Sequence, residues 1–128
     1  MIQLPVVAGL MLCERIDVDV DLARMSLLGI FQRRKFQSFP SSPYDFTVYA
    51  ALSDGAGEGT MAVTITQLSA SLVVHSIRKW FVYPERMLVV NLEVRVHGCV
   101  FPSAGRHSVE LSFDAQPVTE WAFEVVEE

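Results

Sequence analysis

Three histidines are the first residues in this sequence whose type suggests chemistry, because imidazole binds metals and transfers protons near neutral pH. His75, His97 and His107 are spread over three segments that the sequence pattern predicts as strands. Strand pairing can bring two of them together, so a metal site stays open as an alternative. We expect solvated or hydrogen-bonded side chains, which are far more common in proteins.

A second group with chemical potential is the alternating acidic run of Asp17, Asp19 and Asp21. Alternate residues of a strand share a face, so these carboxylates are able to converge on a hard cation. The rest of a calcium-binding loop is absent from the spacing. We therefore predict a solvated turn, where the like charges also discourage edge-to-edge strand pairing.

Catalysis would have to draw on His107, Glu110 or His97 as acid–base groups, but no nucleophile with an orienting partner accompanies them. Cys13 and Cys99 both lie in apolar runs, which is typical of buried free thiols. A disulfide and a catalytic thiol are the less favoured alternatives. We expect no catalytic residues, no cofactor and no metal ligands, and the question of enzymatic activity stays open.

Residues 54–59 are rich in glycine, a composition that phosphate-binding loops share. Those loops present their ligand to the start of a helix, whereas this segment connects two predicted strands. The sequence contains no recognised nucleotide-binding or zinc-helix signature. We interpret the segment as a hairpin turn that needs positive φ angles.

The only basic cluster is Arg33-Arg34-Lys35, which Phe31 and Phe36 flank. Basic side chains between aromatic ones are able to hold a strand of nucleic acid or another anion. Successive residues of a strand point to opposite faces, however, so the three charges do not form one patch. A charge-protected edge strand is the better interpretation, and contact with an anionic partner is the alternative.

A second cluster places Arg78 and Lys79 before Trp80 and Phe81. Trp80 and Phe81 point to opposite faces of a strand, so one should enter the core and the other should be exposed or covered by a partner. An exposed aromatic beside arginine has the composition of an interaction hot spot. The predicted interface residues of the chain are Arg33, Arg34, Lys35, Arg78, Trp80 and Phe81.

These residues are positioned by a series of predicted strands. The clearest signal runs over residues 88–96, where apolar and polar residues alternate with a period of two. The predicted strands cover residues 6–16, 25–36, 45–52, 60–68, 72–82, 88–96, 108–113 and 120–125. A short acidic turn makes a hairpin of the first two. Short strands separated by turn residues are typical of sandwiches and barrels.

Size and charge limit the classes of partner. The 128 residues suit a single β-sandwich domain that spans residues 1–128. The formal net charge is -5, with 10 Lys and Arg against 15 Asp and Glu, and this balance opposes nucleic-acid binding. The apolar stretch 4–12 is too short to span a bilayer, which needs about 20 residues. We expect a cytoplasmic protein without nucleic-acid or membrane partners.

The segment from Phe101 through Gly105 to His107, continuing to Val118, resembles a recurring end of immunoglobulin-like sandwiches. There a Pro-x-x-Gly-x-aromatic turn enters the penultimate strand, and a polar hairpin leads to the last one. His107 stands where many such domains have a tyrosine, and the Cys-Trp-Cys framework is absent. The implied fold class is all-β, an antiparallel two-sheet sandwich, immunoglobulin-like, with about 7–8 strands.

Taken whole, the chain resembles an uncharacterised bacterial family of short proteins that carries a domain-of-unknown-function label. The matching segments are residues 8–14, 26–31, 39–40, 51–55 and 101–105. The resemblance covers nearly the whole length. It implies a sandwich fold, and it supplies neither an activity nor catalytic residues.

The missing chemistry favours a non-catalytic module that binds an unknown protein partner, or a second copy of itself as a homo-oligomer, through exposed strand edges. The alternative is a small-ligand or carbohydrate-binding sandwich in which Tyr44, Tyr49 or Trp80 forms a stacking platform. The sequence identifies no partner beyond these classes.

Overall fold

The computed structural model describes residues 2–84 and 89–128. Within these ranges the chain forms ten strands and one 3₁₀ turn, and no α-helix. The elements are β1 (Val6–Cys13), β2 (Arg15–Asp19), β3 (Arg24–Leu28), β4 (Arg33–Phe36), β5 (Tyr44–Ser53), β6 (Glu58–Gln67), η1 (Leu68–Ala70), β7 (Leu72–Val82), β8 (Val90–Cys99), β9 (Gly105–Phe113) and β10 (Gln116–Glu127). The described residues include no helix long and apolar enough to cross a membrane.

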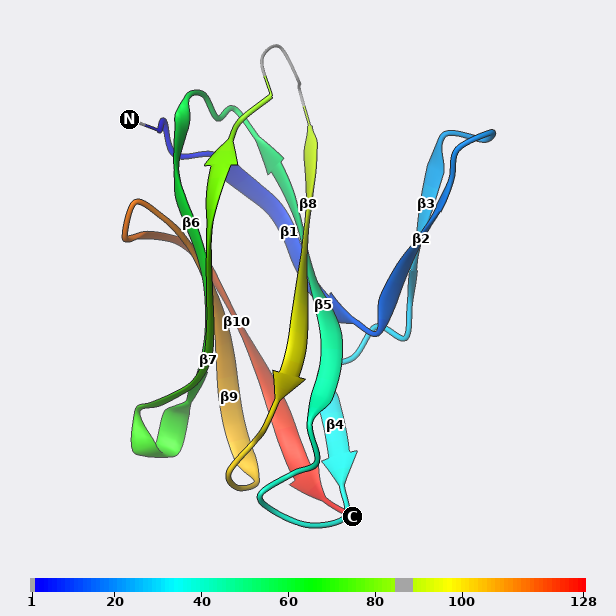
Figure 1. Cartoon of the computed structure of the whole chain (residues 1–128), viewed down its shortest axis with the longest axis vertical. Helices are drawn as coiled ribbons and strands as arrows, with labels where there is room; N and C mark the ends of the chain where they lie inside the picture. Colours follow the sequence, from blue (N-terminus) through cyan, green and yellow to red (C-terminus); the bar gives the residue numbers. More distant parts are fainter. Residues whose placement is uncertain (1, 85–88) are drawn as a thin grey trace.

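Two sheets enclose the hydrophobic core (Figure 1). One has the strand order β1-β5-β8 and the other β4-β10-β9-β6-β7. The alternating patterns of β5, β8 and β9 direct their apolar residues inward, as the period of two predicts. Phe46 from the smaller sheet and Leu111 from the larger one are both fully buried. The all-β prediction is thus confirmed, whereas the strand count and the sheet arrangement differ from the prediction.

The first difference is a third sheet, which over the described residues consists of the pair β2 and β3. The predicted strands 6–16 and 25–36 are each broken in two, because the chain leaves the smaller sheet after β1 and forms a separate hairpin. We call residues 15–28 the arm; Figure 1 shows it standing away from the two main sheets. Asp17 and Asp19 lie within β2, so the turn is residues 20–23 rather than the predicted acidic segment 17–21.

The second difference is the direction of β4, which runs parallel to β10 at the edge of the larger sheet. The amide of Phe31 donates to the carbonyl of Leu12 at 2.9 Å, so the chain bridges from the smaller sheet before it reaches β10. This crossing brings β4 to the sheet in the same direction as its neighbour. The purely antiparallel prediction was therefore wrong at this edge.

The glycine-rich segment 54–59 is also not a hairpin turn. It connects β5 and β6, which belong to different sheets. Asp54 and Gly57 have φ angles of 60° and 82°, so the predicted need for positive φ is confirmed. The segment is a crossover between the two layers of the core.

Candidate functional site

Strand β7 is an edge strand, since the larger sheet ends with it. Phe81 faces inward and packs on Phe113, with ring centroids 5.4 Å apart. Trp80 faces the opposite way and is 65% exposed. The division between these neighbours follows the prediction that one ring enters the core while the other is left to solvent or to a partner.

A polar hollow lies beside Trp80 on the outer face of the larger sheet. Trp80 is the cross-strand partner of Thr60, which lines this hollow. The volume is about 410 Å³, and the other lining residues are Ala62, Thr64, Arg78, Glu110, Ser112, Asp114 and Ala115. Hydroxyl, carboxylate and guanidinium groups are therefore available next to an exposed indole ring.

The basic cluster of β4 does not join this surface. Arg33 and Lys35 are exposed, while Arg34 points to the other side and its guanidinium lies 4.8 Å from the centre of the Tyr44 ring. Burial raises the pKa of the Tyr44 phenol, and the nearby guanidinium opposes that shift. Because β4 and β7 are opposite edges of one sheet, the two predicted interface clusters are separate.

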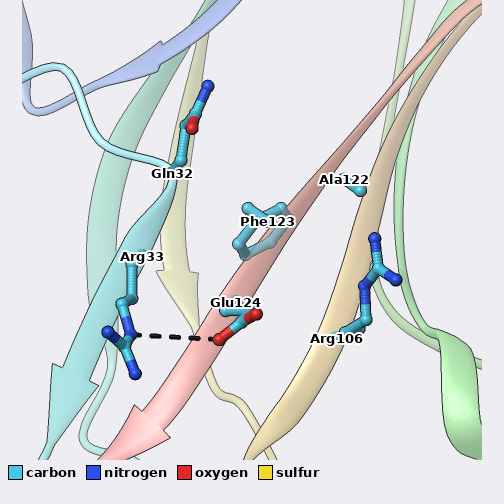
Figure 2. Close-up of a pocket in the computed structure, with 6 residues that line it drawn as sticks. All are labelled: Gln32, Arg33, Arg106, Ala122, Phe123 and Glu124. Atoms are coloured by element: carbon cyan, nitrogen blue, oxygen red, sulfur yellow. Dashed lines mark ion pairs between the residues drawn. The ribbon is translucent and has the colours of Figure 1, made fainter.

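A second hollow of about 390 Å³ lies on the β4 side, where Arg33, Glu124 and Arg106 come from three adjacent strands (Figure 2). The Nε atom of Arg33 is 3.9 Å from Oε2 of Glu124. The carboxylate stands between two guanidinium groups and neutralises part of their charge. Sequence reasoning missed Arg106 and Glu124, because their proximity depends on the register of β9, β10 and β4.

A third hollow, which we call the arm groove, separates the arm from the outer face of the smaller sheet. Its volume is about 420 Å³, and its lining residues are Val18, Ala23, Arg24, Met25, Tyr49, Asn91 and Glu93. The Tyr49 hydroxyl donates to Oδ1 of Asn91 at 2.6 Å, which fixes one wall. At the base of the arm, Arg95 donates to Oγ1 of Thr47 at 2.9 Å and to the carbonyl of Glu14.

The candidate acid–base residues lie apart. His107 is fully buried, with its Nδ1 atom 3.0 Å from the carbonyl oxygen of Gly105, and desolvation lowers its pKa. Glu110 lies on the outer face of the same strand and lines the hollow beside Trp80. His97 is exposed on the other sheet, 3.8 Å from Asp45, whose pKa is lowered chiefly by the hydrogen bond from the amide of Gly98.

The acidic residues of the arm and the two cysteines show no catalytic or metal-binding arrangement in the described part of the chain. Asp17 pairs with Arg15 at 3.4 Å, and Asp19 accepts a hydrogen bond from the amide of Leu22. The described part of the chain holds no group of three metal-ligating side chains. Cys13 and Cys99 are free and buried, as predicted. Burial raises the pKa of the Cys99 thiol to about 11 and also raises that of Cys13.

These features define an all-β protein in which, over the described residues, two packed sheets carry a projecting hairpin and open hollows on their surface. The chain belongs to a family of unknown function, DUF6941, whose model matches residues 9–126. A comparison with curated proteins finds no match.

Proposed function

We propose that this chain is a non-catalytic protein-binding module whose contact surface is centred on Trp80. The observation that carries the proposal is the 65% exposure of this indole on an edge strand. Arg78 lies two residues earlier on the same face and is also exposed. Tryptophan and arginine are the residue types most enriched among binding hot spots.

Strand β7 adds a second means of contact. It has 11 residues, and among the described strands it pairs with β6 alone, so one row of its backbone groups is available to an added strand. Edge strands need protection from unspecific pairing, and the exposed Lys79 together with the irregularity between Ile65 and Thr66 in the pairing register supplies it. A selective contact through side chains such as Trp80 fits this protected edge better than indiscriminate strand addition.

The test is capture from the host lysate combined with light scattering. The variant Trp80→Ala is compared with Leu72→Ala, an exposed apolar residue at the other end of the same strand. We expect the wild type and Leu72→Ala to retain a partner, and Trp80→Ala to bind it about 30-fold more weakly. A monomeric protein that captures nothing reproducibly, or equal binding by both variants, contradicts the proposal.

A small-ligand or carbohydrate-binding role is the second candidate, because the polar hollow lies directly beside Trp80. Sugars stack on exposed aromatic rings while their hydroxyls bond to neighbouring polar groups. Tyr44 is no platform for such stacking, since its hydroxyl is enclosed. A thermal-shift screen with sugars and metabolites tests this role, because a ligand that binds the folded protein raises its melting temperature. A melting temperature that no compound of a broad panel changes contradicts the role.

We extend the proposal to the fold subclass and to the cellular compartment of the protein. The turn that ends at Gly105 leads into the penultimate strand β9, which supports an immunoglobulin-like assignment. Two buried free thiols suit a reducing compartment, and we place the module in the cytoplasm of a bacterial cell.

A further inference from the structure

Cys13 is buried at a place that the hydrophobic core does not explain. Its side chain is 0% exposed, yet it is not part of the core cluster that contains its neighbour Leu12. Successive residues of a strand point to opposite faces, so Cys13 points to the outer face of the smaller sheet. Its cross-strand partner Thr47 lies on the same face and is 1% exposed. The cover of this pair therefore comes from outside the core.

Arg95 spans the row of residues that contains this pair. It is the cross-strand partner of Thr47 on β8, and its guanidinium donates to Oγ1 of Thr47 at 2.9 Å. The same guanidinium donates to the carbonyl of Glu14, the residue that connects Cys13 to the arm. One side chain thus crosses from β8 over β5 and holds the base of the arm beside the buried thiol.

The arm has little other attachment to the molecule. In the part of the chain that the structure describes, no hydrogen bond or ion pair joins residues 15–28 to either main sheet. The arm groove separates the arm from the outer face of the smaller sheet, and Figure 1 shows the hairpin meeting the sheets at its base. The base is therefore the place where the position of the arm is fixed.

The two connections of the arm are packed against each other at this base. The amide of Glu14 donates to the carbonyls of Leu28 at 2.9 Å and Gly29 at 3.2 Å. Gly29 has a φ angle of 69°, and a Cβ atom on it would lie 2.7 Å from Cγ of Glu14. The segment that leaves the arm thus lies directly on the residue that the guanidinium of Arg95 holds.

We propose that the arm is hinged at its base and that Arg95 latches it to the smaller sheet, so that release of this latch uncovers Cys13 while the core stays folded. The inference goes beyond the proposed binding function and does not depend on Trp80. A hairpin of two strands is marginally stable on its own, so its detachment costs less than unfolding the two main sheets. Cys99 lies within the core cluster and serves as the internal standard.

The test is labelling of the folded full chain with a thiol reagent, followed for each cysteine by mass spectrometry of its peptide. Arg95→Met removes the donors of the latch and keeps an unbranched side chain. Cys13 should then react about tenfold to a hundredfold faster than in the wild type, the effect of losing a hydrogen bond from a charged group, while Cys99 stays protected. Arg106→Met, the same change at an exposed arginine of the larger sheet, should leave both thiols protected.

The direction of this change separates uncovering from an electrostatic effect. Burial and the carboxylate of Glu93 raise the pKa of the Cys13 thiol, whereas the guanidinium of Arg95 lowers it. Loss of that guanidinium alone would leave the thiol more fully protonated and therefore less reactive. Faster labelling of Cys13 in Arg95→Met consequently measures its exposure.

A second variant disturbs the base of the arm without changing Arg95. Gly29→Ala puts a side chain at a positive φ angle and against Glu14, so it should also speed the labelling of Cys13 relative to that of Cys99. Protection of Cys13 in Arg95→Met equal to that in the wild type overturns the inference. So does labelling of Cys13 and Cys99 at equal rates in both variants, because the arm then opens only when the whole protein unfolds.

Discussion

Acid should destabilise this protein through His107, well before its carboxylates are protonated. The imidazole is fully buried, with its centre 5.1 Å from that of Phe101 and 5.6 Å from that of Phe123. Its Nδ1 atom lies against the carbonyl of Gly105, and Nε2 has no partner. An imidazolium in this place would hold a charge among aromatic rings, so desolvation lowers the pKa of His107 from its usual 6.5.

The sign of the effect follows from proton binding. Above pH 6.5 the imidazole is neutral in both states, and the full stability is present. As the pH falls below 6.5, the imidazole binds a proton in the unfolded chain but stays neutral in the folded chain. Stability is therefore lost until the pH reaches the lowered pKa that His107 has in the folded state. Each pH unit in this window removes up to about 1.4 kcal/mol.

Between pH 6.5 and about pH 5 the loss therefore reaches at most about 2 kcal/mol, which lowers Tm by roughly 6 °C. Denaturant unfolding at pH values across this range measures it. The variant His107→Phe should abolish this pH dependence of the free energy of unfolding, whatever its effect on stability at neutral pH. The variant His97→Gln, which changes an exposed histidine, is the control and should keep the pH dependence. Asp45 acts in a separate window below about pH 3.8, where its lowered pKa makes protonation costly. If the free energy of unfolding of His107→Phe falls with pH as steeply as that of the wild type, the proposed role of His107 is refuted.

Three further predictions concern stability and thiol reactivity. Gly59→Ala places a Cβ atom 2.6 Å from the carboxylate of Asp114, which accepts a hydrogen bond from the amide of Thr60. The free energy of unfolding, measured with urea, should therefore fall by about 1–3 kcal/mol. An unchanged urea midpoint contradicts this prediction. Asp114 and Ala115 both have positive φ (49° and 65°), and Ala115→Gly should raise stability by up to about 1 kcal/mol, whereas a lower urea midpoint argues against relief of strain. The thiols of Cys13 and Cys99 should react with a thiol reagent only after denaturation, because burial holds both in the protonated form, and rapid labelling of the native protein would contradict their placement.

Several features could be predicted from sequence because they depend on the local geometry of a strand. Side chains of a strand alternate between two faces, so the pattern around Val94 and the division between Trp80 and Phe81 followed from order along the chain. Leu88, the predicted start of that strand, lies outside the described residues. The same reasoning predicted that Arg34 points away from Arg33 and Lys35.

Other features depend on which strands meet, and local order carries little information about that. The acidic alternation of Asp17 and Asp19 looks like a turn flank in sequence, but it becomes a strand because residues 24–28 pair with it. The glycine-rich segment 54–59 looks the same whether it reverses the chain or crosses to another sheet. Only the packed core distinguishes these cases, since burying both sheets fixes the path between them.

The sequence by itself determined an all-β chain, the buried free thiols, and the alternation of two faces along strands such as the one around Val94, because backbone geometry and the hydrophobic effect act on neighbouring residues. The tertiary structure alone decided the parallel position of β4, the projection of the arm and the groove between Met25 and Tyr49. Contacts between distant strands form those features. The physical reason is that register and sheet membership are fixed by the whole core together.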